Sequence, residues 1–108
     1  MVAGTEKFDD ELVCSLEGME KIYNSITKAP IKVMARRIGA KHGEMLYSAD
    51  GYVTAWFMWQ LQGDEEASKA FVGNDAELLK NKLYQNQNIL EWKLKISKGI
   101  IYYTDIIK

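Results

Sequence analysis

The sequence has little of several residues on which whole classes of protein depend. It contains a single cysteine, Cys14, so no disulfide can form within the chain, and a disulfide-stapled fold is excluded. Its 14 basic residues nearly balance its 15 acidic ones, which gives a formal net charge of −1. Such a balance provides no field that attracts nucleic acid or an anionic membrane surface, so neither is expected as a partner.

Long apolar runs are missing as well. The longest, residues 52–61, is far shorter than the roughly 20 residues that a membrane-spanning helix needs. The chain also opens without the basic and apolar leader of a secreted protein. We therefore predict a soluble protein with no membrane span and no signal peptide, and its compartment stays open.

Metal and cofactor motifs are absent from the sequence too. One histidine and one cysteine cannot supply the usual ligands of a zinc site, and no C-x-x-C or H-E-x-x-H spacing occurs. The acidic run at 9–11 lacks the spaced oxygen ligands of a calcium loop, and no glycine-rich phosphate loop is found. The sequence thus predicts neither a metal nor a cofactor.

What the sequence does contain is enough apolar material for one small α/β domain, because 47% of its 108 residues are hydrophobic. Residues 1–4 are typical of the end of a strand, and an acidic loop follows them. Apolar residues then recur at helical spacing over 16–27, with Ser15 as the N-cap. Residues 28–30 break this helix, and the branched residues of 31–37 predict a strand.

Helices are predicted beyond the strand. Ser48 or Asp50 caps a helix over 51–62 that ends at Gly63, and its Trp and Phe residues are expected in the core. Asp64 caps a short helix that ends at Gly73. A third helix begins at 74 or 75 and continues through residue 83.

The last twenty residues have a different character. Residues 89–96 alternate between apolar and charged side chains, and 100–107 form a second strand-like run after a turn that contains Gly99. This pattern predicts a β-hairpin. We divide the chain into an α/β segment, 1–88, and a hairpin-like tail, 89–108.

His42, the only histidine, is the best candidate for a catalytic residue in the sequence. A single histidine between Gly39 and Gly43 is most often an exposed loop residue. Its position favours another interpretation, since it follows a predicted strand, and functional groups of open α/β sheets lie beyond strand ends. An acidic loop that also follows a strand end precedes it by about thirty residues.

Residues 2–88, from "VAGTEKFDDELVC" through "IKVMARRIGAKHGEM" to "DGYVTAWFMWQL", resemble the C-terminal part of an α/β-hydrolase of the lipase-like and polyester-hydrolase-like esterases. In that family the acid of the triad follows the penultimate strand and the histidine follows the last one. The resemblance implies that Asp10 or Asp9 is the acid and His42 the base. It further implies a carboxylic ester as the small-molecule substrate, hydrolysed by acyl transfer to water.

The nucleophile of that family has no counterpart in this chain. No G-x-S-x-G occurs, so the resemblance implies a sequence that is truncated before the nucleophile elbow, and we expect the chain to be inactive alone. So short a piece of a parallel sheet also leaves apolar residues uncovered, which predicts self-association or a complementing N-terminal segment. The alternative function is a stand-alone α/β interaction module that pairs through an exposed strand edge or the hairpin.

Overall fold

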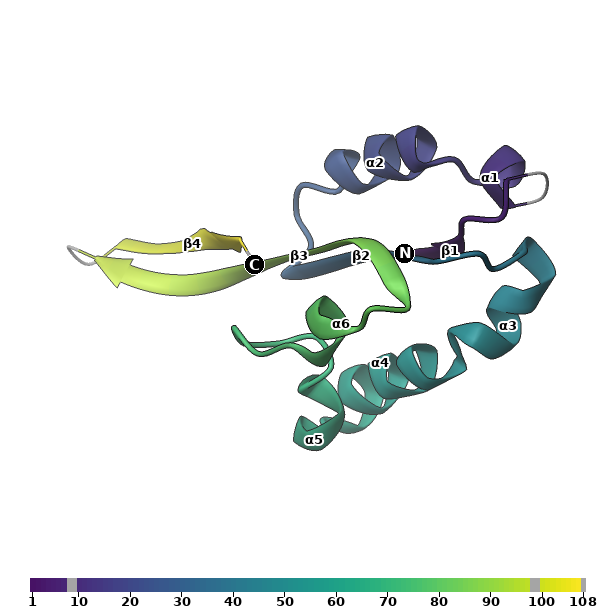
Figure 1. Ribbon diagram of the computed structural model, residues 1–108. Helices are drawn as coiled ribbons and strands as arrows, with labels where there is room; N and C mark the ends of the chain where they lie inside the picture. The colour runs from purple at the N-terminus through teal and green to yellow at the C-terminus, as the bar shows by residue number, and fades with distance from the viewer. Residues whose placement is uncertain (8–9, 98–99, 108) are drawn as a thin grey trace.

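The computed structural model describes the backbone of residues 1–7, 10–97 and 100–107, and the side chains of 1–7 and 12–91. A four-stranded mixed sheet forms its centre (Figure 1). The strands lie side by side in chain order, namely β1 (Val2–Gly4), β2 (Ile31–Arg37), β3 (Tyr84–Ser97) and β4 (Ile100–Ile107). The first pair is parallel and the other two pairs are antiparallel. The predicted α/β class is therefore confirmed.

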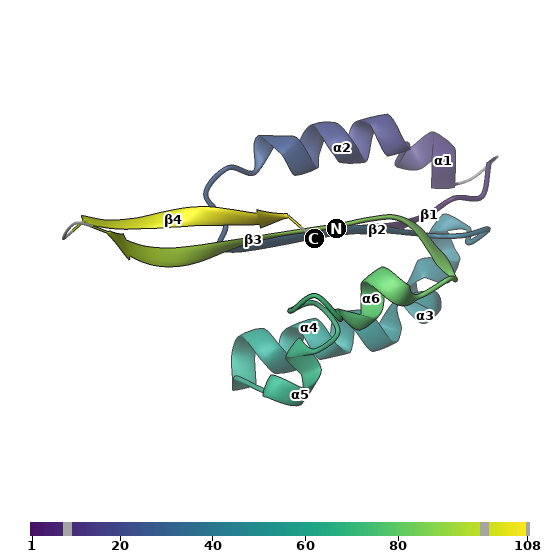
Figure 2. The same cartoon turned by 60° about the vertical axis from the view of Figure 1, so that its left-hand side comes forward.

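Helices cover both faces of the sheet (Figure 2). On one face lie α1 (Asp10–Val13) and α2 (Leu16–Ser25), which connect β1 to β2. A short 3-10 helix, η1 (His42–Glu44), and α3 (Met45–Ser48) lead from β2 to the opposite face. That face carries α4 (Asp50–Gln62), α5 (Glu65–Ser68) and α6 (Glu77–Lys80).

Alternation along β2 divides the core into two halves. Met34 packs with Met19 and Tyr23 against α2. Ala35, its neighbour, packs with Phe71 on the side of α4. Because successive strand residues point to opposite faces, this seven-residue run of mostly apolar residues can bury both of its sides. Within the part of the chain that the structure describes, no helix has both the length and the apolarity to cross a membrane.

Several predicted helix boundaries are wrong. The helix expected over 16–27 ends at Ser25, whose hydroxyl donates to the carbonyl of Ile22 and so offers the backbone a local alternative to the helix. Neither Ser48 nor Asp50 caps α4. Its first turn continues from α3, because the N–H of Ala49 donates to the carbonyl of Met45, and a capping side chain is therefore not needed.

The segment after Gly73 also differs from the prediction. The helix expected through residue 83 covers only Glu77–Lys80, and β3 begins at Tyr84. Residues 84–88, rich in Asn and Gln, become strand because they pair with β2, which overrides their weak strand propensity. The division at 88/89 thus falls inside one continuous strand. The hairpin register runs from Leu90 opposite Ile107 to Ser97 opposite Ile100, and Gly99 lies outside the described residues.

Candidate functional site

The carboxyl ends of β1 and β2 meet at one end of the sheet. The two strands are parallel, with Gly4 opposite Arg37, so the turns that follow them leave the sheet side by side. Two hydrogen bonds join these turns. The N–H of Glu6 donates to the carbonyl of Ala40 at 3.0 Å, and the N–H of Gly39 donates to the hydroxyl of Thr5 at 2.6 Å. The acidic loop and the histidine loop are therefore neighbours in space.

His42 begins the helix η1 immediately beyond these turns. The N–H of Lys41 donates to the Glu44 carboxylate at 2.9 Å, and the N–H of Glu44 donates to the carbonyl of Lys41 at 3.0 Å. These two reciprocal hydrogen bonds close the turn that contains His42. The imidazole is exposed, and η1 contacts β1. The sequence expected a loop at this position, and the closed 3-10 turn fixes the backbone of His42 more firmly than a loop does.

Of the two candidate acids, only Asp10 lies within the residues whose backbone the structure describes. Asp10 is the first residue of α1, a helix that contacts β1. Asp9 lies outside the described residues. The elements that carry Asp10 and His42 therefore both contact β1, although they are some thirty residues apart in the sequence.

Three serines serve the ends of helices. The Ser15 hydroxyl accepts from the N–H of Gly18 at 3.1 Å, which confirms it as the N-cap of α2. The hydroxyls of Ser25 and Ser68 each donate to a backbone carbonyl three residues earlier, both at 2.6 Å. Cys14, half-buried, packs against the core cluster beneath α2. These side chains therefore have structural roles at the ends of helices and in the core.

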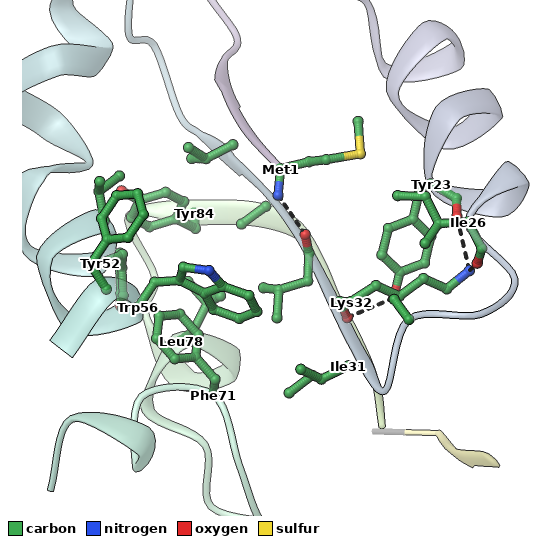
Figure 3. Close-up of a pocket in the computed structure, with 16 residues that line it drawn as sticks. Met1, Tyr23, Ile26, Ile31, Lys32, Tyr52, Trp56, Phe71, Leu78 and Tyr84 are labelled. Atoms are coloured by element: carbon green, nitrogen blue, oxygen red, sulfur yellow. Dashed lines mark hydrogen bonds between the residues drawn. The ribbon is translucent and has the colours of Figure 1, made fainter. Parts of the chain in front are cut away.

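A cavity of about 380 Å³ lies beside β2 and includes the first residue of that strand, Ile31, in its lining (Figure 3). Its floor is the edge of β2 from Ile31 to Val33. Tyr23 lies at one side, and Trp56 and Phe71 lie at the other. Sequence reasoning missed this cavity because its walls come from segments that only the tertiary fold brings together.

A hydrogen-bonded tyrosine, Tyr52, is among the residues that line the cavity. The Tyr52 hydroxyl donates to the Glu77 carboxylate at 2.6 Å and accepts from the Asn81 amide at 2.7 Å. Its ring meets that of Tyr84 edge-on, with centroids 5.2 Å apart. Burial, and next the hydrogen bond to Glu77, raise the pKa of Tyr52 well above its ordinary value of 10.0. Burial also raises the pKa of Tyr84. A second, more polar hollow of about 360 Å³ adjoins this group.

Tyr52 should make the protein sensitive to alkali. The folded chain keeps the phenolic proton at a pH where the unfolded chain releases it, so stability is full below the ordinary pKa of 10.0 and falls as pH rises above it. We expect Tyr52→Phe to cost about 1 kcal/mol near neutral pH and to flatten the fall above pH 10. Urea unfolding across this range measures both. Tyr47→Phe, at a side chain that is 83% exposed, is the control. An unchanged alkaline slope in Tyr52→Phe would contradict the assignment.

Within residues 1–7, 10–97 and 100–107, no group of three or more His, Cys, Asp and Glu side chains is placed to hold a metal ion. Comparison of the chain with protein-family models, with curated proteins and with solved structures found no match.

Proposed function

We propose that this chain supplies the base and the acid of a serine-hydrolase site that acts on carboxylic esters, and that the serine comes from another polypeptide segment. One observation carries the proposal. The acidic turn after β1 and the His42 turn after β2 leave adjacent parallel strands at the same end and are joined by two hydrogen bonds. This is the arrangement that the resemblance to α/β-hydrolases implies.

The chemistry requires these two residue types close together. The imidazole of His42 takes the proton from a serine hydroxyl as the oxygen attacks the ester carbonyl, and later gives it to the leaving alcohol. The carboxylate of Asp10, or of Asp9, holds the ring in the productive tautomer and stabilises its charged form. The imidazole of His42 is exposed on a 3-10 turn, so a serine of another polypeptide segment can approach it from outside the chain.

The chain alone should be inactive as an esterase. Purified protein is expected to hydrolyse a p-nitrophenyl short-chain ester no faster than the His42→Ala variant does, because the sequence contains no nucleophile elbow. The release of p-nitrophenol measures both rates. Clear turnover that depends on His42 would contradict the placement of the nucleophile outside this chain.

A second function, pairing with another polypeptide through a strand edge, is favoured by a separate observation. β1 and β4 are the outer strands of the described sheet. In addition, α4 is apolar on more than one face, and its Val53, Phe57 and Leu61, four residues apart, are 42%, 55% and 78% exposed. An open strand edge beside uncovered apolar side chains is typical of strand-addition sites.

A further inference from the structure

We infer that Thr5 is a positioning residue of the acid–histidine pair, a role that rests on the hydrolase function proposed above. Its hydroxyl fixes the turn before His42 against the segment that leads to Asp10. Both segments leave the sheet at the carboxyl ends of β1 and β2, where α1 and α3 also lie (Figure 1). Thr5 therefore sets how the two members of the proposed site face each other.

A tight β-turn connects β2 to the helix that contains His42. The N–H of Ala40 donates to the carbonyl of Arg37 at 3.4 Å and closes this turn over four residues. Gly39, the third of them, has φ 73°, which is the conformation that a type II turn requires there and that glycine adopts without strain. The N–H of Gly39 has no acceptor inside such a turn, so it needs one from another part of the chain.

Thr5 supplies this acceptor. It is the first residue after β1, it is half-buried, and its hydroxyl oxygen lies 2.6 Å from the nitrogen of Gly39. The next residue, Glu6, donates its N–H to the carbonyl of Ala40 at 3.0 Å. Adjacent residues of one segment thus bind adjacent residues of the other. One bond alone would leave the β-turn free to rotate about it, whereas the two together fix its orientation.

The orientation of this β-turn determines where His42 lies relative to the acid. Ala40 is only two residues before His42, so their Cα atoms are at most about 7.6 Å apart. Asp10 follows Thr5 by five residues and begins α1, which contacts β1. The bond from Glu6 to Ala40 joins backbone atoms and remains in any variant of Thr5. The hydroxyl is the part of this connection that a substitution can remove.

The test follows the His42 imidazole of the full chain by two-dimensional proton–nitrogen NMR. Thr5→Val keeps the branched shape of the side chain but has no acceptor for the N–H of Gly39. We expect the neutral ring to carry its proton on Nδ1 in the unsubstituted chain and to lose this preference in Thr5→Val. Thr5→Ser retains the hydroxyl and should retain the preference.

Amide exchange measures the hydrogen bond itself. In Thr5→Val the amide of Gly39 should exchange about tenfold faster, as expected for the loss of one hydrogen bond, while that of Glu6 stays protected. Thr54→Val is the matched control, because Thr54 is exposed on α4, and it should change neither amide nor the imidazole. Thr5→Ala also removes the hydroxyl and should behave as Thr5→Val does, so the test does not depend on one variant.

Three results would overturn the role of Thr5. A preference for Nδ1 that persists in Thr5→Val and Thr5→Ala, with faster exchange at Gly39, would leave Thr5 a purely structural residue while the acid–histidine pair stands. Loss of the preference in Thr5→Ser as well would show that the hydroxyl is not its cause. An unsubstituted chain in which the His42 ring has no preference would contradict the proposed function itself, and the role of Thr5 with it.

Discussion

Replacing Phe71 by alanine should lower the free energy of unfolding by about 3–5 kcal/mol. Phe71 is only 3% exposed, and its ring contacts those of Trp56, Trp59 and Tyr52 at centroid distances of 5.3, 6.1 and 6.2 Å. Removal of the ring leaves a cavity among rigid aromatic neighbours that cannot collapse into it. Small domains have only about 5–15 kcal/mol of stability, so the loss removes much of it.

Denaturant unfolding followed by tryptophan fluorescence measures this loss, because Trp56 and Trp59 lie against Phe71. Phe57→Ala is the matched control, since it deletes the same side chain from the same side of the sheet where it is 55% exposed. We expect a cost below about 1 kcal/mol there. Equal costs for the two variants would mean that Phe71 is not at the centre of this core.

In an active assembly that provides the serine, one acid substitution should lower kcat about 10⁴-fold. Asparagine at the acid position keeps the shape of the side chain but no longer holds the imidazole in the productive tautomer. We expect this loss for Asp10→Asn, because Asp10 begins a helix that contacts β1 and the sequence continues from it in an acid-x-apolar-apolar pattern.

Asp9→Asn is the built-in control for this experiment, and its kcat should stay within a few-fold of the unsubstituted chain. The reverse result would identify Asp9 as the acid. Small and equal losses for both variants would show that neither residue is the acid, and the proposed site would lose one of its two members.

Local sequence patterns correctly predicted the features that depend on neighbouring residues. The strand 31–37 follows a proline and consists mainly of apolar residues, and its predicted bounds agree with β2. Gly63, in the left-handed conformation at φ 69°, ends α4 at the predicted residue. Asp64 accepts the N–H of Ala67, as expected of the cap of α5.

Elements that depend on distant partners were not predictable in this way. The start of β3 at Tyr84 depends on its pairing with Arg37, 47 residues earlier, and nothing near residue 84 indicates a strand. Phe57 was expected in the core with its two tryptophan neighbours, but α4 packs against the core through the face that carries Ala55, Trp56 and Trp59, and Phe57 lies on another face, where it is exposed.

Some parts of the candidate site were likewise predictable from local sequence patterns, and others were not. The position of His42 beyond a strand was visible in the sequence, and so was the acidic loop. The cavity beside β2 and the Tyr52 hydrogen bonds were not visible, because Tyr52 meets partners 25 and 29 residues away on another helix and its following turn. No local spacing rule connects such residues.

The state of the His42 imidazole tests the proposed site most directly. His42 is the only histidine, so a two-dimensional proton–nitrogen NMR spectrum shows one imidazole. We expect the ring to carry its proton on Nδ1, donated to the acid. One of Asp10→Asn and Asp9→Asn should abolish this preference, and the other should leave it intact. Identical spectra for the unsubstituted chain and both variants would contradict the proposed acid–histidine pair.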